Sequence, residues 1–200
     1  MAEMSASSAR PPALPREERE RRVLDAAAEL FYARGVHEVG MDELVQATGL
    51  GKATVYRLYP SKDHLVAAYL QRLAGTILAA IDAEITRHHG DPAAALLGIL
   101  DAIEADLRRP GFRGCAFNNA SIEYDDPAHP ARAQARSYRE ALRNRLTGLA
   151  AKLDPLTGPV LGGQLAVLVD GAYTSAAHLG PDGPAADGLR LARHLIRERQ

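Results

Sequence analysis

The chain has 200 residues and carries 24 Lys and Arg against 25 Asp and Glu, so its formal net charge is -1. Hydrophobic residues make up 46% and charged residues 24%, a globular composition that excludes a disordered chain, a histone-like polycation and an acidic tail. A single cysteine, Cys115, excludes an internal disulfide and a multi-cysteine zinc site. No apolar run approaches the roughly 18 residues of a membrane span, and no signal-peptide core is found, so we expect no membrane partner and a cytoplasmic location.

The N-terminal part of the chain is predicted to be an arm followed by three helices. Residues 1–14 are rich in Ser and Pro, which is typical of a flexible arm. From Pro15, apolar residues recur at helical spacing until Gly35 supplies a stop, which predicts the first helix. Two short helices are predicted next, joined by the turn Thr48-Gly49-Leu50-Gly51, and they cover residues 41–48 and 52–59.

The rest of the chain is predicted to be helical as well, because no stretch shows the period-two alternation of a strand. Ser61 is the expected N-cap of a long helix that ends at His88-His89-Gly90. Further apolar stripes predict helices over about residues 92–107, 115–124, 135–153, 161–179 and 189–196. We therefore predict an all-α fold of about nine helices. A three-helix head covers residues 15–60, and a helical bundle, the body, covers residues 61–200.

The charge pattern of the head favours DNA binding. Two short helices joined by a brief turn have the size of a helix-turn-helix, whose second helix enters the major groove. Between Gly49 and Lys62 the chain carries Lys52, Arg57 and Lys62 and no acidic residue. Five arginines against three glutamates between Arg10 and Arg22 add a net charge of +2. DNA phosphates bind cations and hydrogen-bond donors, so this charge pattern suits contact with DNA. The alternative interpretation is a solvated turn between two helices that pack on each other.

Three spaced elements occur in order in the head: Arg22-Val23-Leu24-Asp25-Ala26-Ala27 with Leu30-Phe31 and Gly35, then Gly49-Leu50-Gly51-Lys52-Ala53-Thr54-Val55-Tyr56, then Ser61-Lys62-Asp63-His64-Leu65. Together they resemble the TetR family of bacterial transcriptional regulators, over residues 16 to about 70. The resemblance implies that residues 15–60 form a DNA-binding domain. It also implies that residues 61–200 form an effector-binding and dimerisation domain.

Six residues of the head are candidates for DNA contact. Lys52, Thr54 and Arg57 have spacings that suit contacts with bases, and Arg57 is the expected reader of guanine. The resemblance implies that Tyr56 and Lys62 contact the phosphate backbone, while a packing role is the alternative for Tyr56. The backbone amides around Met41, at the start of a short helix, are a further candidate phosphate site.

The effector site is predicted from residues that the family's architecture places beside a central cavity. Phe117 and Tyr173 would provide flat apolar walls. Asn118 and the Tyr173 hydroxyl would orient a polar group on a small, mainly hydrophobic molecule. The alternative is that all three are core residues. For Cys115 we expect a small buried side chain rather than a redox sensor.

Small residues gather in the 161–179 segment, where they would let another helix approach closely. The family dimerises through its last two helices, so we expect a homodimer with Gly162, Gly171, Ala172 and Ala176 at its interface. Two heads would then read the two half-sites of a pseudo-palindrome.

These observations predict a repressor that a small molecule releases from double-stranded operator DNA. We expect no enzyme and no cofactor, because the chain carries no nucleotide-binding Gly loop, nucleophile elbow or Glu-x-x-His ligand pair. An alternative is a helical-bundle metal-binding protein or enzyme that uses Glu123, Asp126 and His129. An exposed acidic turn explains the same residues more simply. A DNA-binding module with no ligand is a third possibility.

Overall fold

The computed structural model describes residues 14–199 of the chain, so the predicted arm over residues 1–14 lies outside the described residues apart from its last position. Within this range the chain forms nine α-helices and no strand, which confirms the predicted all-α fold. The helices are α1 (Arg16–Arg34), α2 (Met41–Thr48), α3 (Lys52–Leu58), α4 (Lys62–Arg87), α5 (Pro92–Leu107), α6 (Ala116–Ile122), α7 (Pro130–Leu153), α8 (Gly158–Leu179) and α9 (Pro184–Arg197).

The helix boundaries follow from capping chemistry. At the start of α4 the Ser61 hydroxyl accepts the His64 amide at 3.3 Å, as the sequence predicts. At the start of α5 the Asp91 carboxylate accepts the Ala94 amide at 2.8 Å. The first helix ends at Gly35, whose φ of +90° lies in the region that favours glycine.

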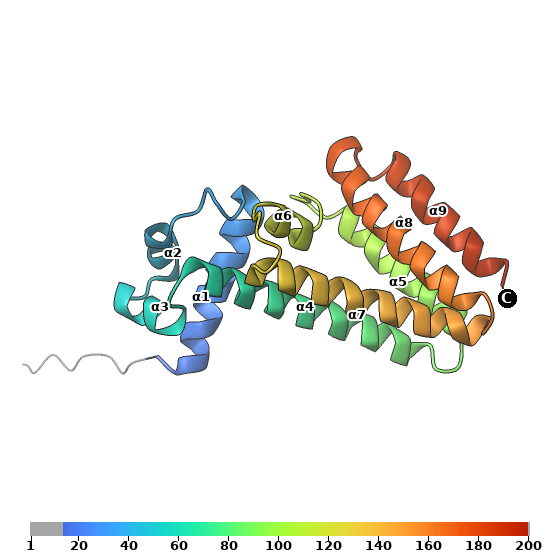
Figure 1. Cartoon of the computed structure of the whole chain (residues 1–200), viewed down its shortest axis with the longest axis horizontal. Coiled ribbons are helices and arrows are strands. Elements are labelled where there is room, and N and C mark those ends of the chain that lie inside the picture. Colours follow the sequence, from blue (N-terminus) through green and yellow to red (C-terminus); the bar gives the residue numbers. More distant parts are fainter. Residues whose placement is uncertain (1–13, 200) are drawn as a thin grey trace, which may run out of the picture.

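The helices form an elongated molecule with the head at one end (Figure 1). The head helices α1, α2 and α3 lie at that end, α8 and α9 lie at the other, and α4 and α7 run side by side between them. Of the helices in the described part of the chain, α4 alone is long and apolar enough to cross a membrane by length and composition. The core helix of a globular protein passes the same test, and α4 packs on α1, α5, α6 and α7.

Two hydrophobic cores hold the fold together. One core lies between α5, α7, α8 and α9. The other joins α1, α2 and α3 to the first turns of α4, where Leu65, Val66, Tyr69 and Leu70 are buried, and it includes Phe117 of α6 and the start of α7. Tyr138 of α7 packs against both cores. The head is therefore packed on the body through apolar contacts that continue beyond residue 60.

Helix α8 presents its small residues to two different surroundings. Ala172 and Ala176 are 2% and 6% exposed and belong to the core, and Gly162 is also buried. A Cβ on Gly162 would meet the Cα of Thr147 at 2.4 Å, so this glycine lets α7 and α8 approach each other. The predicted contact of Gly162, Ala172 and Ala176 with a partner subunit would need surface that the chain itself covers. Gly171 is exposed, with nothing within 4 Å of its Cβ position.

Replacing Gly162 by Ala is therefore expected to destabilise the fold. A methyl group at this position must push α7 and α8 apart, which costs about 1–3 kcal/mol of unfolding free energy. Gly148→Ala in α7 is the matched control, because its Cβ position has nothing within 4 Å and alanine favours a helix by up to about 1 kcal/mol. Urea denaturation at one protein concentration measures both changes. Equal stability of the two variants would contradict the close α7–α8 contact.

Candidate functional site

The turn between α2 and α3 is built around Thr48 and Gly49. The Thr48 side chain is buried; its hydroxyl donates to the Val45 carbonyl at 2.8 Å and accepts the Leu50 amide at 3.1 Å. Gly49 has a φ of +65°, the left-handed conformation that ends α2. These contacts fix how α3 leaves α2. The buried threonine is a determinant of the turn that the sequence analysis missed, although a threonine just before Gly49 is itself a local signal of turn formation.

Helix α3 is anchored by one residue and exposes its cations. Val55 is fully buried in the head core. Lys52 and Arg57 are exposed, whereas Thr54 and Tyr56 are half-buried. Within residues 14–199 the Arg57 guanidinium forms no ion pair or side-chain hydrogen bond. Arg57 therefore presents five donors to whatever approaches this end of the molecule.

Lys52 is held in place by an acidic neighbour from α2. Its ammonium lies 2.7 Å from the Asp42 carboxylate and 5.8 Å from the centre of the Tyr56 ring. The hydrogen bond with Asp42 raises the pKa of Lys52, so the side chain stays protonated. The predicted contact residues Lys52 and Tyr56 are thus neighbours. The segment from Gly49 to Lys62 contains no acidic residue, but the fold places Asp42 of α2 beside it.

Lys62 has structural partners in the loop between α1 and α2. Its ammonium donates to the carbonyls of His37 at 3.3 Å and Val39 at 3.0 Å. These bonds tie the start of α4 to that loop and hold the charge beside α2. No side chain in the described residues caps the N-terminus of α2 at Met41, but Asp42 and Glu43 lie in the same turn and oppose an anion there.

Three arginines of α1 pair with glutamates of the same helix. Arg21 and Arg22 both pair with Glu18, each at 2.8 Å, and Arg16 pairs with Glu20 at 2.7 Å. These glutamates are already counted in the net charge of +2 between Arg10 and Arg22, so the pairs orient the arginines and leave that excess in place. On α3, by contrast, Arg57 is exposed and has no acidic partner among residues 14–199.

The three predicted effector residues lie on a polar and aromatic seam inside the body. Phe117 is 1% exposed and stacks on Tyr138, with ring centres 3.9 Å apart. The Asn118 side-chain oxygen accepts a hydrogen bond from Arg139, which also pairs with Asp170 of α8. The Tyr173 hydroxyl donates to Asp106 at 2.8 Å, and burial together with Asp106 raises the pKa of Tyr173. Asn118 and Asp170 are brought together through Arg139, whereas Phe117 and Tyr173 belong to different cores.

Two hollows in the described surface lie away from this seam. One, of about 290 Å³, lies between α1 and α2 and includes Arg22, Glu29 and Thr48. The other, of about 540 Å³, lies between α4 and α5 and includes Glu84 and Gly98. Neither hollow is lined by Phe117, Asn118 or Tyr173, so the contact of these three residues with an effector stays a prediction.

Cys115 lies at the start of α6. Burial raises the pKa of its thiol, which disfavours the reactive thiolate.

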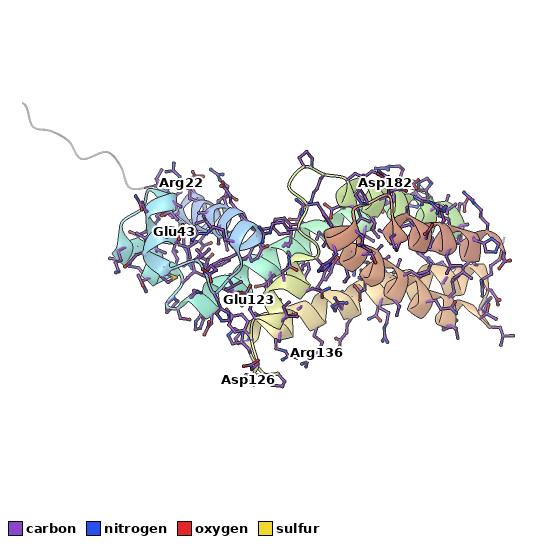
Figure 2. All side chains as sticks on the ribbon, turned by 90° about the horizontal axis from the view of Figure 1, so that it is seen from above. Arg22, Glu43, Glu123, Asp126, Arg136 and Asp182 are labelled. Atoms are coloured by element: carbon purple, nitrogen blue, oxygen red, sulfur yellow. The ribbon has the colours of Figure 1, made fainter. Side chains whose placement is uncertain are left out.

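The three residues that could form a metal site, Glu123, Asp126 and His129, have separate roles in the structure. Glu123 accepts the backbone amides of Val36 and His37, and the His129 ring accepts the Ala131 amide at the start of α7. Asp126 accepts the Ala128 amide in the turn, and Figure 2 shows it at the outer tip, beyond Glu123. Among the described residues, no group of three His, Cys, Asp or Glu side chains is placed to hold a metal ion. The structure does not support this alternative.

An exposed stripe runs along α8 on the side opposite the core. It contains two large apolar side chains, Val160 and Val167, which are 64% and 70% exposed. Gln164, Gly171 and Thr174 continue the stripe at helical spacing. On the adjacent α9, Leu191 is 48% exposed. This face of α8, with α9 beside it, is not covered by the rest of the described chain, and of the four residues predicted for the dimer interface it contains Gly171.

Comparisons with known proteins agree with the geometry of the head. The family model described as bacterial regulatory proteins, tetR family, matches residues 23–69, from α1 into the first turns of α4. The HTH-type transcriptional activator FasR of Mycolicibacterium smegmatis is 30% identical over 165 residues, which cover 80% of this chain and 73% of the relative.

Solved structures extend the similarity to the body. A TetR-family transcriptional regulator from Streptomyces coelicolor is 32% identical with a TM-score of 0.85, covering 91% of this chain and 96% of its own. A TetR transcriptional regulator from Chloroflexus aurantiacus, 22% identical, has the same fold with a TM-score of 0.78, covering 92% of this chain and 96% of its own.

Proposed function

This chain belongs to the TetR family of bacterial transcriptional regulators, and we propose that it is a cytoplasmic, homodimeric repressor that a small, mainly hydrophobic molecule releases from operator DNA. Residues 15–60 would read the DNA, and residues 61–200 would bind the effector and the second subunit. The observation that carries the proposal is the exposed surface of α3, where Arg57 is free of ion pairs within residues 14–199 and Lys52 is exposed as well. Bidentate donors of this kind recognise guanine in the major groove.

A dimer is supported by the outward face of α8. One head alone offers one short helix, which is too little surface for tight and specific binding. Two copies related by a two-fold axis would bury Val160 and Val167 against each other's α8 and α9. They would also hold two α3 helices at a fixed separation, which suits two half-sites.

An effector in the body is supported by the polar seam between α6, α7 and α8. Arg139 connects Asn118 to Asp170, and Tyr173 is bonded to Asp106, so groups that can orient a ligand already face one another. A molecule that replaces these contacts in one arrangement of the helices and not in another would shift the balance between them. A ligand that binds both arrangements equally would change nothing.

Footprinting of the purified chain on the DNA upstream of its own gene tests the proposal. We expect two protected half-sites related by a dyad, with centres about 10 bp or a multiple of it apart. Transcription from that DNA should rise when the regulator is deleted. Because the Mycolicibacterium smegmatis relative is named an activator, a fall in transcription on deletion is the result that would replace repression by activation.

Arg57 is expected to carry sequence discrimination. Arg57→Ala should weaken operator binding by about 1–3 kcal/mol and relax the preference at one base pair of each half-site. Arg57→Lys is the matched control, since it keeps the charge and loses the bidentate fork, so discrimination falls while the salt dependence stays. Gel-shift titrations on single-base variants of the operator, at several salt concentrations, measure both. Unchanged discrimination in both variants would remove Arg57 as a reader.

Val167 is expected to lie at the centre of the dimer interface. Val167→Arg removes two buried valines per dimer and places two like charges together. At about 1.5 kcal/mol for each valine, the dimer dissociation constant should rise at least about 100-fold. Ile122→Arg is the control, because Ile122 is 78% exposed on α6, outside α8 and α9. Sedimentation velocity gives the result, and a dimer as stable as the control's would place the interface elsewhere.

A further inference from the structure

Helix α6 is attached to the head at its C-terminal end through Glu123. The Glu123 carboxylate accepts the backbone amides of Val36 at 2.8 Å and of His37 at 2.6 Å, which follow α1. A Cβ on Gly35 would meet a carboxylate oxygen of Glu123 at 3.2 Å, so glycine leaves room for this approach. Figure 2 shows Glu123 where α6 meets the head.

The N-terminal end of α6 is attached to the head through Tyr32. The Tyr32 hydroxyl, in the last turn of α1, accepts the Arg113 amide at 2.7 Å and donates to the Gly114 carbonyl at 3.0 Å. Arg113 and Gly114 lie just before Cys115, the N-cap of α6. The two ends of this seven-residue helix are thus bonded to the same end of α1.

A chain of contacts continues from Tyr32 to α8. The Arg109 guanidinium lies 4.5 Å above the centre of the Tyr32 ring. One oxygen of Asp106 accepts a hydrogen bond from Arg109 at 2.7 Å, and the other accepts the Tyr173 hydroxyl at 2.8 Å. The Asp106 carboxylate therefore connects Tyr173 of α8 to Arg109, which in turn contacts Tyr32 of α1.

We propose that Tyr32 and Glu123 form a clamp that positions the head on the body, and that Tyr173, through Asp106 and Arg109, controls the Tyr32 half of it. The end of α1 and the loop before α2 then follow any movement of α6 or α8. This is a route to the DNA-reading helices that does not pass along α4. That the clamp serves regulation depends on the proposed function, whereas its mechanical role does not.

Hydrogen–deuterium exchange of the intact chain, free of DNA and of any added ligand, tests the clamp. The reporter is the peptide 33–40, which contains the two amides bound by Glu123, and a peptide from α9 is the internal reference. Loss of a hydrogen bond should speed exchange of the reporter by about three- to tenfold in Tyr32→Phe and in Glu123→Gln. Tyr173→Phe should speed it at least about twofold, and combining Tyr173→Phe with Tyr32→Phe should add little, since the chain is already broken.

Tyr124→Phe is the matched control. Its hydroxyl is buried at the same junction and has no hydrogen-bond partner in the described structure, so the reporter should exchange as in the parent chain. A purely structural loss would instead speed exchange of the α9 peptide as much as that of residues 33–40. That outcome, or a Tyr32→Phe reporter that matches the control, would overturn the clamp. A Tyr173→Phe reporter that matches the control would overturn the connection to α8.

The outcome of the hydrogen–deuterium exchange experiment does not depend on the outcome of the footprinting experiment. A chain with no footprint can still show selective exchange at residues 33–40, and a chain with a clear footprint can lack it. Failure of the clamp and failure of the proposed DNA-binding function are therefore separate outcomes.

Discussion

The loop between α1 and α2 carries main-chain groups that its own helices leave without partners, and the rest of the chain supplies those partners from two sides. The amides of Val36 and His37 bind the Glu123 carboxylate, and the carbonyls of His37 and Val39 bind the Lys62 ammonium. Backbone groups away from water must be paired, and charged partners form the stronger bonds. One carboxylate and one ammonium thus hold this loop against the rest of the chain.

This arrangement explains why the head and the body share a hydrophobic core. Phe117 and Ala120 of α6 are buried with the residues of α1 and α4, so the ionic contacts close around an apolar centre. Apolar packing alone is not directional, whereas hydrogen bonds set an angle. Both are needed if a change within the body is to alter the separation of two reading helices.

Periodicity and capping residues predict the nine helices because these signals are local. Ser61 begins α4 and Gly35 ends α1, each through a contact with a residue no more than four positions away. Tyr32 and Gly114 are 82 positions apart, and no local pattern marks their contact. Small residues suit both a tight core and a dimer interface, so their presence in α8 does not indicate which face of the helix meets a partner. Ala172 continues the apolar stripe of α8, and the structure buries it within the chain.

Glu123 holds the head by groups that every amino acid except proline possesses. The side chains at these positions add to that contact, because Val36 is buried in the core shared with α6 and the His37 ring lies 3.3 Å from the Glu123 carboxylate. A different reading head can be joined to this body if it keeps the same turn, the apolar residues of the shared core and Tyr32, and places no proline at those two positions. In such chimaeras, operator specificity and effector specificity are separable, so the two can diversify independently during evolution.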